Sequence, residues 1–290
     1  MDNSIIISNE ELVELWLYSR PENTIASYKL HVKRFLGSVD KPLTEVTLLD
    51  LQYWQLSLSG MNKSSQKTAL AIIKSLFSFG YELGVLKLNI AKLTKLPQVK
   101  EGLAQKILST AEVRLMIELE INPRNRAILL MLYGCGLRVS ELCSLTWNDL
   151  KSRENGGQMT VFGKGGKTRV ILIPPYVWEA VIILKNIGGD SPVFRSRQIG
   201  KNGYHLTRKQ VENIVSTASD RAGIERKVSP HWLRHSHASH SLDSGAPLSL
   251  VQQTLGHSSI STTEKYLHAK PDDSSGMYIK FFDYSATNQC

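Results

Sequence analysis

The sequence predicts a mainly helical protein with two domains, of which the second also contains a small antiparallel sheet. In residues 64–83, apolar side chains recur at spacings of three and four, the period of one helix face. Two strand-like segments, Met159–Phe162 and Arg169–Ile173, flank the glycine- and lysine-rich turn 163–167, which is typical of a hairpin. Between these regions, residues 96–108 combine weak periodicity with a proline and a glycine, which indicates a linker.

The first domain, residues 1–95, is predicted to be entirely helical because no segment in it alternates with the period of a strand. Four helices are expected, and each has an apolar stripe after its start signal. Their expected starts are Ser8 in the capping box Ser8–Glu11, Asn23 or Thr24 after the break at Pro21, Thr47, and about Ser64.

The second domain, residues 109–290, begins at another capping box, Ser109–Glu112. Its remaining helices are expected at about 125–134, 138–145, 176–187, 207–222, 231–243, 247–255 and 260–268. The two strand-like segments form the one small sheet that the sequence predicts.

Composition narrows the class of protein. The 290 residues are 42% hydrophobic and 21% charged, which is ordinary for a soluble globular protein and argues against long disorder. No apolar run approaches the ~18 residues of a membrane helix, and the N-terminus lacks the basic segment of a signal peptide. Three cysteines (Cys135, Cys143 and Cys290) do not make a disulfide framework, so a cytoplasmic location is expected.

The net charge of +9 is unevenly distributed. Residues 1–62 carry a net charge of −3, whereas residues 63–100 carry seven lysines against Glu82 alone. Such a basic block indicates either a surface that faces nucleic-acid phosphates or a solvated helix face followed by a lysine-rich linker.

Two clusters in the second domain could bind an anion. In Gly134–Leu142, two glycines place Arg138 at the start of a helix with Glu141 one turn later, so Glu141 could orient the guanidinium toward an oxyanion. An ordinary surface ion pair explains the same spacing. The turn 163–167 could carry a lysine to a phosphate or could be a solvated hairpin tip; it lacks the spacing of a nucleotide-binding phosphate loop.

Two further clusters lie near the C-terminus. His231 and Arg234 share one helix face, which suits a phosphoryl group. Four histidines in ten residues raise the alternative of a metal site, but no acid or cysteine has the spacing of a ligand set. Tyr266 follows nine residues after His257, and it becomes a candidate nucleophile only if basic groups converge on it.

Taken together and in this order, the four clusters resemble the tyrosine recombinases, which include the phage integrases and the Xer-type resolvases of chromosome dimers. The segments Tyr133–Leu142, His231–Ser236 and Leu255–Thr263 are similar to family signatures, most closely those of the Xer subgroup. The resemblance covers about residues 109–268 by motif. By layout it also covers the N-terminal helices, which are similar to the family's SAM-like core-binding domain.

The resemblance implies that Tyr266 attacks a DNA phosphodiester, forms a 3′-phosphotyrosine and releases a 5′-hydroxyl. Arg138 and Arg234 would bind the non-bridging oxygens and neutralise the charge that develops in the transition state. A tyrosine hydroxyl has a pKa near ~10, so a cationic cluster or a base must assist it at neutral pH.

The resemblance also implies supporting roles. Lys164, or Lys167 on the same turn, would protonate the leaving 5′ oxygen. His231 would take or orient the tyrosine proton, His257 would hydrogen-bond the phosphate, and Glu141 would support the first arginine and His231.

The implied partner is double-stranded DNA with two inverted half-sites, bound by a homo- or hetero-tetramer that passes through a Holliday junction, with an activator protein as a further option. The residues expected to contact DNA phosphates are Lys63, Lys67, Lys74, Lys92 and Lys95. No metal and no other cofactor is expected, and no membrane. Dimer resolution and the integration or excision of a mobile element both remain open. The tail 271–290 is expected to dock on a neighbouring subunit.

The alternatives are a type IB topoisomerase-like enzyme that relaxes DNA, a DNA-binding protein without catalysis, and a histidine-dependent metallohydrolase.

Overall fold

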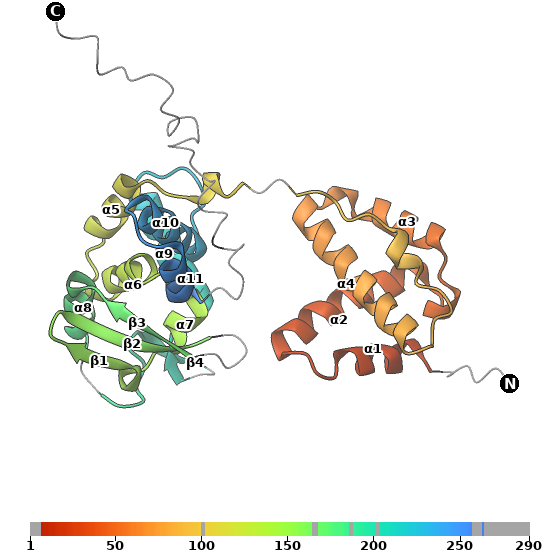
Figure 1. The fold of residues 1–290 in the computed structure, drawn as a ribbon, viewed down its shortest axis with the longest axis horizontal. Helices are drawn as coiled ribbons and strands as arrows, with labels where there is room; N and C mark the ends of the chain where they lie inside the picture. The colour runs from red at the N-terminus through yellow and green to blue at the C-terminus, as the bar shows by residue number, and fades with distance from the viewer. Residues whose placement is uncertain are drawn as a thin grey trace, which may run out of the picture. The chain divides into compact units, whose positions relative to one another are not determined.

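The computed structural model describes residues 7–99, 102–163, 168–185, 188–200, 203–256 and Thr263. The chain divides into two compact units, Met1–Glu101 and Gly102–Cys290 (Figure 1). Over the described ranges, none of the helices has the length and apolar character needed to cross a membrane.

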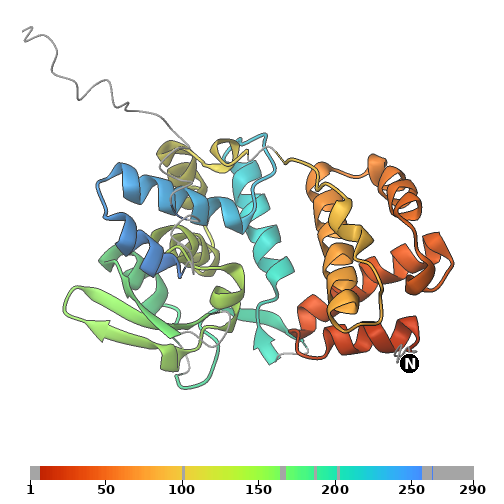
Figure 2. The same cartoon turned by 45° about the vertical axis from the view of Figure 1, so that its right-hand side comes forward.

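Helices build the first unit (Figure 2). In its described part these are α1 (Asn9–Leu17), α2 (Glu22–Val39), α3 (Leu48–Ser57) and α4 (Lys63–Glu82), with short 3-10 helices η1 (Leu43–Glu45), η2 (Leu58–Gly60) and η3 (Ile90–Leu93). Phe35 is fully buried at the centre. Its ring makes edge-to-face contacts with the rings of Trp54 and Phe77, at centroid distances of 5.0 and 6.1 Å. These aromatic contacts join α2, α3 and α4 in one core.

Local start signals decide where the helices begin. The capping box at Ser8 and the start at Thr47 are confirmed, and each of these side chains accepts a backbone N–H three residues ahead. The expected cap at Asn23 or Thr24 is wrong, because α2 begins at Glu22 with Pro21 as its N-cap. Proline has no N–H to leave unpaired, and the carboxylate of Glu22 is favoured in the positively polarised first turn.

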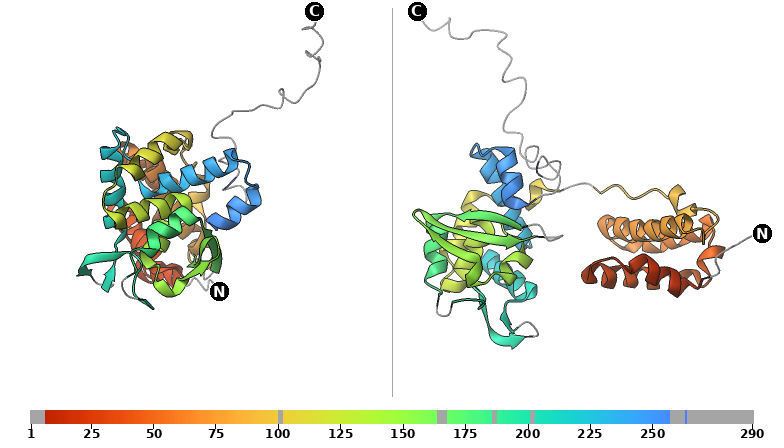
Figure 3. Two further views of the ribbon diagram at one scale, coloured as in Figure 1. Left: turned by 90° about the vertical axis from the view of Figure 1, so that its left-hand side faces the viewer. Right: turned by 60° about the horizontal axis from the view of Figure 1, so that its bottom comes forward.

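The second unit consists of helices packed against a sheet (Figure 3). Its described helices are η4 (Ala104–Lys106), α5 (Thr110–Glu118), α6 (Pro123–Gly134), α7 (Val139–Ser144), η5 (Trp147–Asp149), α8 (Pro175–Ile182), α9 (Arg208–Arg221), α10 (Pro230–Asp243) and α11 (Leu248–Leu255). The capping box at Ser109 is confirmed. Helix α8 ends before the expected 187, because the N–H groups of Leu184 and Lys185 turn to i−3 carbonyls.

The predicted hairpin is confirmed: β2 (Gly156–Phe162) pairs antiparallel with β3 (Thr168–Ile173). The expectation of a single two-stranded sheet is wrong. Strand β1 (Leu150–Arg153) adds an edge next to β2, and β4 (Arg195–Gly200) with β5 (Gly203–His205) forms a second sheet. Strands β1 and β4 are mostly polar, so they carry no apolar alternation that the sequence could reveal.

Helix α6 lies at the centre of this unit. Five of its residues are fully buried: Ala127, Ile128, Leu129, Met131 and Leu132. A helix that is apolar on all sides must be covered on all sides, and α5, α7, α8, α9 and α10 pack around it. The C-terminal end of α6 is thereby fixed, and from it the chain turns into α7. The expected helix 260–268 lies outside the described residues except for Thr263, which is buried and helical.

Candidate active site

A tight turn after α6 delivers Arg138 to the start of α7. Gly136 has a φ of 61°, and a Cβ there would lie 2.7 Å from Cδ2 of His237, so glycine is needed both for its conformation and for its size. Arg138 is the N-cap of α7, and its N–H donates to Glu141 Oε2 at 2.8 Å. Its Nη1 donates to Glu141 Oε1 at 2.8 Å, so the predicted pairing of Arg138 with Glu141 is present.

Arg234 approaches the same region from the middle of α10. Its side chain is buried, with only 3% of the residue exposed. Nη1 donates to the carbonyl of Gly136 and Nη2 to the carbonyl of Leu255, each at 2.5 Å. Two fixed carbonyls thus hold the plane of a buried guanidinium, which needs hydrogen-bond partners when it is removed from water.

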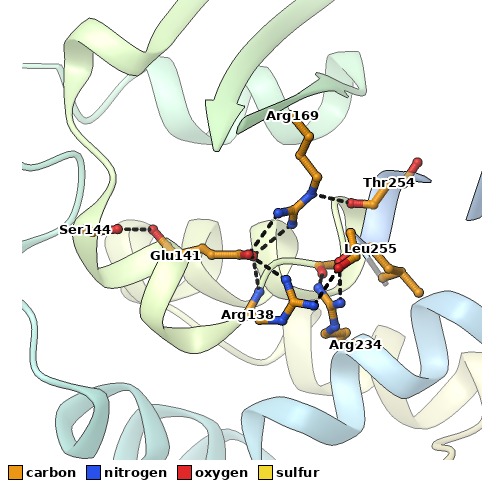
Figure 4. Close-up of polar contacts among 9 residues, drawn as sticks. Arg138, Glu141, Ser144, Arg169, Arg234, Thr254 and Leu255 are labelled. Carbon is orange, nitrogen blue, oxygen red and sulfur yellow. Dashed lines mark hydrogen bonds and ion pairs between the residues drawn. The ribbon is translucent and has the colours of Figure 1, made fainter. Parts of the chain in front are cut away.

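Arg169, in β3, is a third arginine of this cluster, and the sequence did not predict it. Its Nη1 and Nη2 donate to Oε1 and Oε2 of Glu141, both at 2.9 Å, in a bidentate ion pair (Figure 4). A signal existed, because Arg169 alternates with Ile171 and Ile173, which face the core. Val170 is apolar as well, so the sequence could not show which face of the strand points inward.

The C-terminal end of α11 is the point where the three arginines meet. The carbonyls of Thr254, Leu255 and Gly256 accept hydrogen bonds from Arg169 Nε (2.8 Å), Arg234 Nη2 (2.5 Å) and Arg138 Nη2 (3.0 Å), respectively. The last carbonyls of a helix have no partner within the helix and carry partial negative charge, which favours cations. Gly256 ends α11 in the left-handed conformation, with a φ of 63°.

Glu141 is the acid at the centre of the cluster. Only 5% of the residue is exposed, and both carboxylate oxygens accept two hydrogen bonds each. Burial alone would raise the pKa of Glu141, but the hydrogen bonds from Arg169 and then Arg138 outweigh it and lower the pKa below its ordinary value. Glu141 therefore stays ionised between the two arginines.

His231 lies one turn before Arg234 on α10, and its ring stacks on that of His235 with centroids 5.8 Å apart. Partial desolvation lowers the pKa of His231, and the positive charges of Arg234, Arg138 and Lys106 lower it further. His231 therefore lies within the electrostatic influence of both Arg234 and Arg138, whereas no contact joins it to Glu141 among the described residues.

The remaining histidines of α10 have partners within the fold. His237 Nδ1 lies 2.6 Å from the carbonyl of Tyr133, and His240 Nδ1 lies 2.9 Å from the hydroxyl of the same tyrosine. Burial lowers the pKa of His237 to about 4. The expectation that His237 is a packing residue is confirmed. Among the described residues, no group of three or more His, Cys, Asp or Glu side chains has the arrangement of a metal site.

Residues 104–272 match the model of the phage integrase family, which is more than half of the chain. The chain belongs to the phage integrase family.

The relatives specify the branch of the family. The chain is 36% identical to the tyrosine recombinase XerA of Pyrococcus furiosus (87% of this chain, 85% of that protein) and 33% identical to XerD of Oceanobacillus iheyensis (90% and 92%). It is 31% identical to XerC of Thermodesulfovibrio yellowstonii (85% of each protein). This integrase-family member is a site-specific tyrosine recombinase, which disfavours the topoisomerase, non-catalytic and metallohydrolase alternatives.

Solved structures support the fold. The XerH recombinase bound to its difH substrate before cleavage has a TM-score of 0.70 at 21% identity and covers 90% of this chain, which covers 82% of that one. A lambda integrase dimer bound to a core site has a TM-score of 0.73 at 20% identity, with 92% and 98% covered.

Four residues that the family resemblance assigns to catalysis lie outside the described residues: Lys164, Lys167, His257 and Tyr266. The described chain flanks the lysine-bearing turn on both sides and runs up to His257 from one side. Phe162 and Thr168 pair across the base of the lysine-bearing turn, and His257 directly follows the end of α11. Arg169 directly follows Thr168 and bonds Glu141, and Gly256 directly precedes His257 and bonds Arg138. The described chain that leads to the lysine-bearing turn and to His257 therefore lies at the arginine cluster.

The lysines expected on DNA differ in their surroundings. Lys63, Lys67, Lys92 and Lys95 are exposed. Lys74 is partly buried, and its Nζ donates to the carbonyls of Lys92 at 3.2 Å and Thr94 at 2.5 Å. Lys74 therefore fastens η3 to α4, whereas the other four ammonium groups face solvent.

Proposed function

We propose that this recombinase breaks a DNA strand by attack of the Tyr266 hydroxyl oxygen on a phosphodiester. The bond between Tyr266 Oη and phosphorus forms while the bond between phosphorus and O5′ of the next nucleotide breaks. The products are a 3′-phosphotyrosine and a free 5′-hydroxyl. Attack by a 5′-hydroxyl on the phosphotyrosine rejoins a strand, so the bond energy is retained and no ATP is consumed.

The convergence of Arg138 and Arg234 at the end of α11 carries the proposal. Charge that develops on non-bridging oxygens is best stabilised by donors that are already fixed in place. Arg234 is held by two carbonyls, while Arg138 keeps 30% of its side chain exposed. The hydrogen bonds of the Arg138 guanidinium to described residues use two of its five N–H donors, and the others can face a phosphate.

Proton transfer is assigned to neighbouring groups. The lowered pKa of His231 favours its neutral form, which accepts the proton of Tyr266 as the hydroxyl attacks. Lys164 donates a proton to the leaving O5′, with Lys167 as the alternative on the same turn. His257 donates a hydrogen bond to the phosphate. Glu141 supports the arginines and is not consumed.

The DNA partner is double-stranded, with two inverted half-sites. The recombinase acts as a tetramer of this chain, or of this chain with a second recombinase, through a Holliday junction, and lambda integrase, which shares the fold, has been solved as a tetramer on such a junction. In the first domain, residues 1–95, the exposed side chains of Lys63, Lys67, Lys92 and Lys95 bind DNA phosphates. The linker 96–108 joins this domain to the catalytic domain. An accessory activator and docking of the tail 271–290 on a neighbour complete the proposed assembly.

We also place the enzyme in the cytoplasm, where Cys135 and Cys143 remain free thiols.

A covalent capture experiment tests the proposal. A library of nicked duplexes with randomised half-sites is incubated with the protein in EDTA, and adducts that survive SDS are isolated and sequenced. A nick next to the scissile phosphate lets the short 5′-hydroxyl fragment diffuse away, which traps the phosphotyrosine. Wild type and the matched control Tyr278→Phe are expected to form adducts on one half-site sequence, and Tyr266→Phe is expected to form none. Absence of an adduct from wild type, or a requirement for metal, would overturn the proposal.

A further inference from the structure

Arg169 has no assigned part in the reaction, although its guanidinium bonds two other elements of the site. Three hydrogen bonds leave this guanidinium: two reach Glu141 in α7 and one reaches the carbonyl of Thr254 in α11. Only 12% of the Arg169 side chain is exposed, so it is not presented to solvent as a ligand-binding group. Its bonds instead connect β3 to both elements that hold Arg138.

We propose that Arg169 is a positioning residue for strand cleavage: by clamping Glu141 and the end of α11, it directs Arg138 toward the scissile phosphate and leaves its positive charge available. The inference rests on the proposed function.

Arg169 keeps a net positive charge in the cluster. Glu141 and Arg138 alone form a pair with no net charge, which is a poor partner for a phosphate. Arg169 adds a second guanidinium to the same carboxylate, so the three side chains together keep one net positive charge. Arg138 is the more exposed of the two arginines (30% against 12% of the side chain), so the net positive charge is accessible to a phosphate at Arg138.

Arg169 also fixes the orientation of the Glu141 carboxylate. Glu141 Oε1 accepts from both Arg138 Nη1 and Arg169 Nη1, and Oε2 accepts from the Arg138 N–H and Arg169 Nη2. The bidentate geometry fixes the plane of the carboxylate. Without Arg169, two of these four bonds are lost and the carboxylate can rotate, which carries the Arg138 guanidinium with it.

Arg169 holds the C-terminal end of α11 as well. Arg169 Nε bonds the carbonyl of Thr254, and the next two carbonyls along the chain bind Arg234 and Arg138. The backbone is fitted closely to Arg169, because a Cβ on Gly256 would lie 3.1 to 3.2 Å from the Arg169 guanidinium and Cδ. Arg169 therefore fixes the register of the carbonyls that align both catalytic arginines.

The test uses the half-site that wild type captures best and measures the single-turnover rate of adduct formation. Arg169→Gln removes both the positive charge and the bidentate guanidinium group. Arg169→Lys keeps the charge but cannot make the bidentate pair. We expect a fall of about 10- to 100-fold for Arg169→Gln, since small misplacements of catalytic groups cost up to ~100-fold. Arg169→Lys should recover part of the rate. DNA affinity should change by less than about threefold, because Arg169 does not touch DNA in the proposal.

Arg221→Gln is the matched control. Arg221 also pairs with a buried acid, Glu120, at 3.0 Å and also bonds a backbone carbonyl, that of Leu119, but it lies on α9 away from the arginine cluster. Arg221→Gln should lower thermal stability comparably, because it also breaks a pair with a buried acid, and it should leave the rate close to that of wild type, because neither Arg221 nor Glu120 bonds the arginine cluster.

A second substrate separates positioning from general destabilisation. A methylphosphonate at the scissile position lacks one negative non-bridging oxygen, so the reaction depends less on the charge of Arg138. The rate ratio of wild type to Arg169→Gln should shrink on this substrate, which a merely structural role would not produce.

The inference is overturned if both Arg169 variants react at the wild-type rate. It is also overturned if Arg169→Gln is slowed no more than Arg221→Gln, or if the rate ratio is equal on the two substrates. Should Arg169→Gln not fold, Arg169→Lys carries the same comparison. If wild type itself forms no adduct, the proposed function fails, which is a distinguishable result.

Discussion

Replacing Glu141 by glutamine removes the negative charge at the centre of the arginine cluster while it preserves the size of the side chain. In the wild type, the carboxylate accepts four hydrogen bonds from two arginines, and 5% of the residue is exposed. The amide of Glu141→Gln offers one oxygen and directs an NH₂ group at arginine donors. Two guanidinium groups then face each other without a compensating charge.

The magnitude follows from the burial of the pair. Removing one partner of a buried ion pair costs about 3–5 kcal/mol, and the partial exposure of Arg138 places this site near ~3 kcal/mol. A folded unit of the size of residues 102–290 loses roughly 2–4 °C per kcal/mol. The melting temperature of this unit should therefore fall by roughly 6–12 °C, as measured by scanning calorimetry.

The pH dependence has a definite sign. Because the folded-state pKa of Glu141 is lowered, its contribution to stability is complete above the unfolded value of about 4.3 and is lost as the pH falls through the folded value. The difference between wild type and Glu141→Gln should therefore narrow below about pH 4.3.

Glu118→Gln is the control, because Glu118 forms an exposed i,i+4 pair with Arg114, which is 78% exposed. Exposed helix pairs contribute about 0.3–0.5 kcal/mol, so this variant should shift the melting temperature by less than about 2 °C. If Glu141→Gln melts within the range of Glu118→Gln at neutral pH, the buried charge cluster does not stabilise the fold and the reasoning is refuted.

Three further predictions concern other parts of the chain. Gly136→Ala should destabilise the second unit by at least about 1–2 kcal/mol, the cost of a left-handed non-glycine residue, whereas Gly188→Ala, which meets only ordinary contacts, should change its melting temperature little. Wild type should lose stability in urea unfolding as the pH falls from about 6.5 to about 4, because the unfolded chain binds the proton of His237 more readily than the folded chain, and His237→Asn should reduce that slope. Lys67→Gln should lower the salt slope of DNA binding by about 0.9 without a change in stability; Lys74→Gln should instead lower the stability of the first unit, since its ammonium holds two backbone carbonyls.

Local signals in the sequence predicted much of the fold. The capping boxes at Ser8 and Ser109 each combine a side-chain acceptor with an acid three residues later, and this short-range chemistry survives folding unchanged. The hairpin of β2 and β3 was also readable from two apolar runs around a glycine-rich turn. By contrast, β1 and β4 are stabilised by their neighbours in the sheet rather than by their own residues, so no local pattern revealed them.

The site was predicted as a set of residues but not as an arrangement. Arg138 and Glu141 are three residues apart on one helix start, so their contact followed from helix geometry. Arg169 and Glu141 are 28 residues apart and meet only because β3 packs beside α11, from where the Arg169 side chain reaches Glu141 in α7. The three carbonyls at the end of α11 are invisible to any reading of side chains, although they hold all three arginines.

The identity of the residue that becomes linked to DNA tests the central claim most directly. Wild-type adduct captured on the nicked half-site can be digested with trypsin and nuclease, and the nucleotide-bearing peptide can be sequenced by tandem mass spectrometry. We predict one nucleotide that is joined through its 3′-phosphate to the hydroxyl oxygen of Tyr266, in a peptide that begins after Lys265. Attachment to Tyr278 of the same peptide, to a serine, or through a 5′-phosphate would contradict the account.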